Sequence, residues 1–151
     1  MSKMTKTNKS RKNSVSRKAR TTSNKFEREI TCKFLQMLNT VKLYHWKTYS
    51  YPTHKATDEL YSKLGDNIDK FIEILLGKFN NRINLTTIKS LPLRDVSSPE
   101  EFKREIVSYK NYLVGLSSNP GMKCMSNTDL FNIRDEMLGD LNQFLYLFTF
   151  R

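Results

Sequence analysis

Apolar residues recur every three or four positions over two long stretches of the first half of the chain, from about 23 to 47 and from about 53 to 80. This spacing is typical of amphipathic helices. Tyr49, Ser50 and Pro52 interrupt the pattern, so the two stretches predict two separate helices. Their apolar positions are Phe26, Ile30, Phe34, Met37, Leu38 and Val41, followed by Leu60, Leu64, Ile68, Phe71, Ile72, Leu75 and Phe79.

The second half of the chain predicts two more helices. A capping box at Ser98–Glu101, with Pro99 at the first helical position, marks the start of one that runs to about Leu116. After a turn, the other follows Ser126 and continues to the C-terminus. Their apolar positions are Phe102, Ile106, Tyr109, Tyr112 and Leu113, followed by Leu130, Ile133, Met137, Leu141, Phe144 and Leu145.

The connection between the second and third helices, residues 81–97, is the longest one, and a short strand-like or helical piece fits around Leu85 to Leu91. Two long helices, a long connection and two more helices are typical of a four-helix bundle with a crossover, the ferritin-like arrangement. We therefore predict an all-α fold for residues 26–151.

Residues 1–25 have a different composition from the rest of the chain. They hold nine of the 26 Lys and Arg residues and no acid, which leaves 17 basic and 15 acidic residues elsewhere. Few of these 25 residues are apolar, so we expect a disordered basic tail. Nucleic acid is its leading partner, because a polycation binds phosphate backbones without reading sequence. The residues expected to contact DNA are Lys3, Lys6, Lys9, Arg11, Lys12, Arg17, Lys18 and Arg20.

Other readings of the tail remain open: a targeting signal such as SRKAR, an anionic membrane surface, or no partner at all. The sequence shows no apolar segment of signal-peptide or transmembrane type, because FLYLFTF (144–150) is too short to span a bilayer. Cys32 and Cys124 have no metal-type spacing, which favours a reducing compartment. We expect a cytoplasmic or nucleoid-associated protein. The composition, rich in Lys and Asn, also fits an AT-rich genome such as that of a large DNA virus, in which case virion or nucleus is expected.

One group of polar residues has the chemistry of a metal site. His54, Asp58, Asp69 and Glu73 fall within about 100° of one another on the second predicted helix, beside its apolar stripe. His45 lies at the end of the preceding helix, one short connection away. Carboxylates mixed with imidazole suit iron or another divalent first-row metal. The alternative is a solvated helix face, whose acids pair with Lys55, Lys63 and Lys70.

The same residues carry a resemblance to a known family. His45-Trp46, then His54, an acid four residues on, another eleven further and a last one four beyond resemble the Dps group, the DNA-protecting miniferritins. The specific motifs cover about residues 25–80. The step from His45 to His54 is nine residues, where the family usually has twelve.

The resemblance implies a ferritin-like homo-oligomer, a dimer at least and a dodecameric shell if the likeness is complete. It implies a ferroxidase site that binds Fe2+ and oxidises it to Fe3+ between two subunits. His45, Asp69 and Glu73 would come from one chain, and His54 and Asp58 from its partner. Trp46 would shield the site or lie in the subunit interface. Removing iron and peroxide together would protect DNA under oxidative stress.

Two rival functions remain open at this point. One is a ferritin-like protein that packages DNA with an inactive metal site. The other is a helical adaptor that docks a protein partner through the aromatic stretch FLYLFTF.

Overall fold

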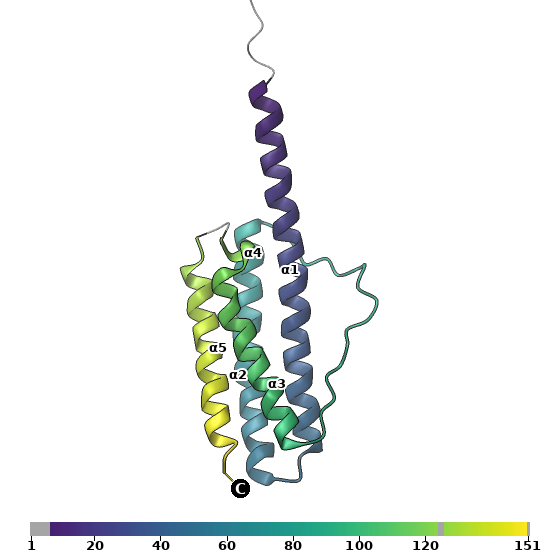
Figure 1. Cartoon of the computed structure of the whole chain (residues 1–151), viewed down its shortest axis with the longest axis vertical. Coiled ribbons are helices and arrows are strands. Elements are labelled where there is room, and N and C mark those ends of the chain that lie inside the picture. Colours follow the sequence, from purple (N-terminus) through teal and green to yellow (C-terminus); the bar gives the residue numbers. More distant parts are fainter. Residues whose placement is uncertain (1–6, 124–125, 151) are drawn as a thin grey trace, which may run out of the picture.

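In the computed structural model, four long helices lie side by side, and the part of the chain that it describes contains no strand (Figure 1). The structure describes residues 7–123 and 126–150, with the backbone alone for residues 7–16 and 19. The elements are α1 (Thr7–Lys47), α2 (Tyr51–Phe79), α3 (Pro99–Gly115), the 3-10 turn η1 (Leu116–Ser118), α4 (Pro120–Lys123) and α5 (Thr128–Leu147).

The order of the helices follows from the lengths of their connections. A short turn reverses the chain between α1 and α2, whereas the segment between α2 and α3 crosses from one end of the bundle to the other (Figure 1). Consequently α2 and α3 run in the same direction, and α5 returns antiparallel to α3. α2 packs against both α1 and α5, and α3 packs against α5. Within the described residues, no helix is long and apolar enough to cross a membrane.

The predicted apolar stripes meet in one core. Phe34 of α1 meets Phe71 of α2 edge to face, with ring centroids 5.3 Å apart. Tyr44 of α1 stacks on Phe102 of α3 at 4.0 Å. Leu38, Ile72, Phe79, Tyr112 and Leu145, which were predicted with the stripes, are only partly buried at the edge of this core.

Local signals explain most helix ends. The capping box at Ser98 is present as predicted, with Glu101 donating its backbone N–H to the Ser98 side chain. α2 begins at Tyr51, two residues before the predicted start, because Ser50 caps it and the first turn tolerates Pro52. Asn80 ends α2 in the left-handed conformation, with φ of 48°. The segment between α2 and α3 has a turn at residues 86–87 and no helix or strand around Leu85 to Leu91.

The N-terminal region differs from the prediction of a disordered tail. Residues 7–25 form the first part of α1, and the residues before Ser23 project beyond the bundle (Figure 1). They contain no Gly or Pro, and Lys and Arg are good helix formers, so a helix nucleated in the bundle extends into them. The packed part begins at Ser23, which is buried and donates a hydrogen bond to Glu27 at 3.1 Å. Residues 1–6 lie outside the described residues.

Candidate metal centre

His45 and His54 face each other across the turn between α1 and α2. Their rings stack with centroids 3.9 Å apart and planes 23° apart. His45 Nδ1 lies 3.0 Å from the backbone oxygen of His54, and His54 Nδ1 lies 3.1 Å from the backbone oxygen of His45. Each imidazole is therefore oriented by the backbone of the other histidine.

This reciprocal bonding sets the tautomer of both rings. A carbonyl oxygen only accepts hydrogen bonds, so Nδ1 of each neutral imidazole must carry the proton. The lone pair of each ring is then on Nε2. Histidines that bind metals usually donate the other ring N–H to a carbonyl or carboxylate in this way. His45 is 7% exposed, and its Nδ1 also lies 3.1 Å from the hydroxyl of Thr57, so its ring is held firmly.

Asp58 is the acid nearest to the histidine pair. Its Oδ1 lies 4.0 Å from His45 Nε2 and 3.7 Å from Nζ of Lys42. The Lys42 ammonium also lies over the rings of Tyr61 and Trp46, with 4.7 and 5.8 Å to their centroids. A carboxylate, an imidazole with a free lone pair and a competing cation thus share one place on the surface.

Asp69 and Glu73 lie farther along α2 and are exposed. Eleven residues separate Asp69 from Asp58, which is about 16 Å along a helix axis. Within the described residues, no group of three or more His, Cys, Asp or Glu side chains could hold a metal. Asp69 and Glu73 make no hydrogen bond or ion pair with any described residue.

The expected division of ligands between two chains stays a prediction, but within one chain His45 has other neighbours than that division assumed. His45 was assigned with Asp69 and Glu73 to one half of the site, yet it lies beside His54 and Asp58 of its own chain. The reason is the short turn, which stacks the end of α1 on the first turn of α2. The alternative, a solvated helix face, expected the acids of the constellation to pair with Lys55, Lys63 and Lys70. The pairs differ: Lys63 pairs with Glu59 at 2.8 Å, and Asp58 pairs with Lys42.

Two residues of this region were missed by the sequence reasoning, namely Lys42 and Thr57. Each lies three residues from a histidine on the same helix, so helical spacing was the signal that could have found them. Trp46 is 68% exposed, so in a single chain most of its side chain faces solvent.

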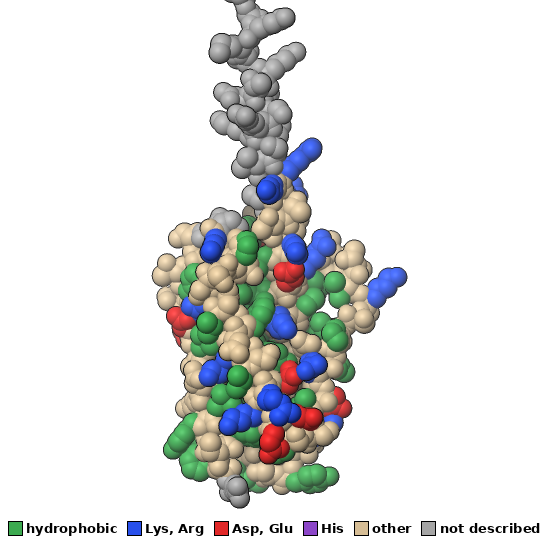
Figure 2. All heavy atoms as spheres, viewed as in Figure 1, with side chains coloured by type: hydrophobic (Ala, Val, Ile, Leu, Met, Phe, Trp, Pro, Cys, Tyr) green, Lys and Arg blue, Asp and Glu red, His purple; other side chains and the backbone are tan. Residues whose placement is uncertain are grey.

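The expected DNA-binding residues fall on the projecting part of α1 or before it. Arg17, Lys18 and Arg20 are exposed on the helix. Figure 2 shows Lys and Arg side chains on the projecting segment and around its base. Lys3 and Lys6 lie outside the described residues, as do the side chains of Lys9, Arg11 and Lys12, whose backbone is helical.

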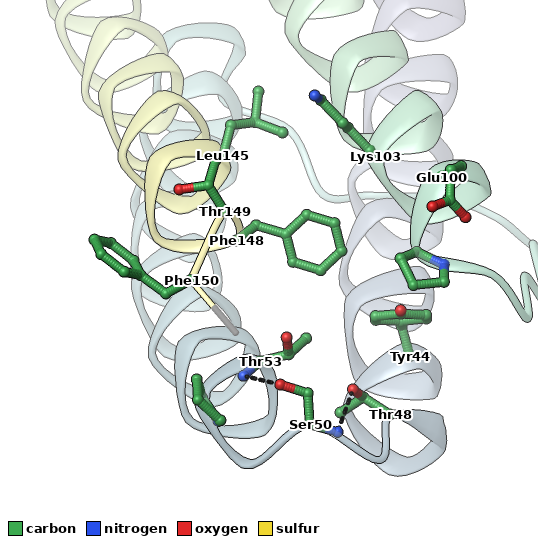
Figure 3. A pocket seen from close by; sticks show the side chains of 12 residues that line it. Tyr44, Thr48, Ser50, Thr53, Glu100, Lys103, Leu145, Phe148, Thr149 and Phe150 are labelled. Atoms are coloured by element: carbon green, nitrogen blue, oxygen red, sulfur yellow. Dashed lines mark hydrogen bonds between the residues drawn. The ribbon is translucent and has the colours of Figure 1, made fainter.

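A hollow of about 760 Å3 lies where α1 ends and α2 and α3 begin, closed on one side by the C-terminal segment (Figure 3). Tyr44 lines it, together with Thr53 and Phe148, and the charged groups of Glu100 and Lys103 lie at its border. Burial raises the pKa of Tyr44, and the negative charge of Glu100 adds to this effect.

Three residues of the aromatic stretch at 144–150, namely Phe144, Leu145 and Phe148, lie in the core or pack against it. Phe144 is buried, and Phe148 stacks on it at 5.4 Å between centroids. Only Tyr146 and Phe150 of its large apolar side chains are exposed. Part of the stretch therefore stabilises the bundle itself, and the adaptor function stays an untested alternative.

Comparison with known protein families identifies one family to which the chain belongs. The model of DUF5856, a family of unknown function, matches residues 45–148. The match begins at His45 and includes His54, Asp58, Asp69 and Glu73, whereas the projecting part of α1 lies outside it. Searches of curated proteins and of solved structures found no match. Since the matched region covers more than half of its length, the chain belongs to the DUF5856 family.

Proposed function

We propose that the protein is a Dps-like, ferritin-like protein that binds and oxidises ferrous iron at a site shared by two subunits and holds DNA through its basic N-terminal helix. The observation that carries the proposal is the histidine pair, whose backbone bonds leave Nε2 as the free nitrogen of each ring. The long crossover between α2 and α3 supports a ferritin-like bundle.

The distance between the histidines and the acids Asp69 and Glu73 supports a site that two subunits share. One half of the site consists of His45, His54 and Asp58, and the other of Asp69 and Glu73, which lie too far along α2 to join it in the same chain. A second copy packed against this face brings its own Asp69 and Glu73 to the histidines. Exposed aromatic side chains near the turn support such an interface. They are Trp46, Tyr49 and Tyr51.

For the oxidation of iron, the protein needs only to bind the ferrous ions and to stabilise the higher charge of the ferric product. Ferrous iron is the substrate, and each ion gives one electron. Two ions reduce one peroxide to two waters with the uptake of two protons, and dioxygen is the other candidate oxidant. The imidazoles and carboxylates suit iron as ligands, and the carboxylates favour the more highly charged ferric product. Iron and peroxide are thereby removed together, so hydroxyl radicals do not form beside bound DNA.

One observation favours a second function, non-enzymatic DNA packaging. Lys42 pairs with Asp58, so its ammonium competes with a metal ion for the carboxylate that lies nearest to His45. If this pair persists in the assembled protein, the metal site is inactive, and the basic helix on a ferritin-like bundle acts as an architectural DNA-binding element.

Oxidation of ferrous iron distinguishes the two functions. The purified protein is mixed with ferrous iron and peroxide or oxygen, and ferric absorbance is followed in the near ultraviolet. Wild type should be faster than buffer, and the Asp69→Ala/Glu73→Ala variant slower by about tenfold or more, as expected for lost ligands. Asp66→Ala is the control, because this acid is also exposed on α2 but lies outside the constellation. Equal rates for wild type and the double variant would favour packaging.

A further inference from the structure

A small basic hollow lies where α1 leaves the bundle and α2 ends. Its volume is about 220 Å3, and three arginines border it: Arg20 and Arg28 from α1 and Arg82 from the segment after α2. Arg20 and Arg28 are exposed and eight residues apart, so they share one face of the helix, with Asn24 between them.

Local structure brings Arg82 to this face. Asn80 ends α2 in the left-handed conformation, which turns the following residues toward α1. Asn81 then fastens them, since its side-chain amide donates to Glu27 at 2.9 Å and to Asn24 at 3.4 Å. Arg82 donates to the backbone oxygen of Asn81 at 3.0 Å.

The acceptors around the hollow are already engaged. Glu27 is 3% exposed, and its two oxygens accept from Ser23 and Asn81. The side-chain oxygen of Asn24 accepts from Asn81, and that of Asn84 accepts from Thr86.

What remains available in the hollow is a set of donors. The amide NH2 groups of Asn24 and Asn84 make no hydrogen bond with a described residue, and no described carboxylate pairs with the three arginines. Glu27, which lines the hollow, bonds to Ser23 and Asn81 instead, and Glu29 pairs with Lys25 at 3.6 Å. Planar guanidinium groups and amide donors around a small hollow suit an oxyanion with several acceptor oxygens, of which phosphate is the common biological example.

We propose that this hollow holds a phosphate group of the DNA backbone, as a structured anchor at the base of the projecting helix. The inference rests on the DNA binding of the proposed function. It adds a fixed contact point for the DNA at the base of the basic N-terminal helix. Arg17 continues the same helix face outward from the hollow, and Figure 2 shows basic side chains around the base of α1 and on its projecting part. A duplex seated at the anchor therefore runs along the basic helix.

The test measures binding of the full-length protein to a short DNA duplex at several salt concentrations. The Arg28→Gln/Arg82→Gln variant removes two guanidinium groups of the hollow. Its control is Lys89→Gln/Lys103→Gln, which removes the same charge at exposed lysines outside the hollow that have no ion pair with any described residue. Circular dichroism checks that both variants keep the helix content of wild type.

We expect the arginine variant to bind about tenfold more weakly than the control at moderate salt, with a salt dependence shallower by about one to two counterions. If it binds as the control does, the hollow is not the anchor, and the residues before Arg20 make the contact. If wild type itself does not bind duplex DNA, both this inference and the DNA binding of the proposed function are overturned.

Discussion

His45 and His54 differ from ordinary surface histidines because each ring is bonded to the backbone of the other. The arrangement leaves no freedom in the choice of tautomer, and it also joins the end of α1 to the start of α2. Lys42 is the residue that opposes metal binding there, since its ammonium lies 3.7 Å from Asp58. Under the proposed function, the competition between this cation and a metal ion for Asp58 decides whether the site is active.

Replacing Lys42 with methionine should therefore strengthen binding of ferrous iron. The aliphatic stem is kept, while the charge that competes for Asp58 is lost. A partly exposed ion pair contributes about 0.2–1 kcal/mol, so the expected gain in affinity is roughly 1.4- to 5-fold. Anaerobic titration with ferrous iron measures it.

Lys33→Met is the matched control for this change. Lys33 is half-buried on the same helix and lies over an aromatic ring, that of Tyr112, but no acid pairs with it within the described residues. If Lys42→Met binds iron no better than Lys33→Met, Asp58 is not a ligand.

At the scale of elements, the short helix α4 holds α1 at the point where the latter leaves the bundle. Gly121 of α4 lies so close to Phe26 that an added Cβ would overlap the Cβ and Cγ atoms of the phenylalanine. These atoms are next to the α1 backbone and have little room to move. The contact thus fixes the base of the projecting helix, next to the arginine hollow.

Gly121→Ala should lower the free energy of unfolding by about 1–3 kcal/mol, the usual cost of overpacking. Gly139→Ala in α5 is the control, because its Cβ would meet nothing within 4 Å and the helix gains from alanine by about 0.5–1 kcal/mol. Urea unfolding followed by circular dichroism measures both. An unchanged or raised stability for Gly121→Ala would mean that α4 does not hold α1 tightly.

The ends of helices could be predicted from the sequence where a capping or helix-breaking residue marks them. The capping box gave the start of α3, and Asn80 gave the end of α2. The helix over residues 7–22 was missed because a composition with few apolar residues indicates only that the segment is not buried. The segment takes its helical conformation from the helix that it continues. The hollow was missed for another reason: Arg28 and Arg82 are distant in sequence and meet only through the turn at Asn80.

At the scale of the whole molecule, the described residues of one chain contain no complete metal site, and under the proposed function they supply two half-sites. A helical wheel of α2 predicted that His54, Asp58, Asp69 and Glu73 share a face. It could not predict that the short turn would stack His45 on His54. A wheel also shows only angles, so it left out the separation of about 16 Å along the helix axis between Asp58 and Asp69, which follows from the rise per residue. Under the proposed function, a twofold pair of chains completes two equivalent sites, each with histidines from one subunit and acids from the other.

The most direct test of this sharing is the rate of iron oxidation by mixed assemblies. Chains with Asp58→Ala and chains with Asp69→Ala/Glu73→Ala are each expected to be slower than wild type by about tenfold or more when alone, since one half of every site is damaged. When the two are co-expressed, random pairing gives mixed dimers in about half of the cases, each with one intact site, so about a quarter of the wild-type rate should return. A co-expressed sample no faster than the separate variants would contradict the shared site.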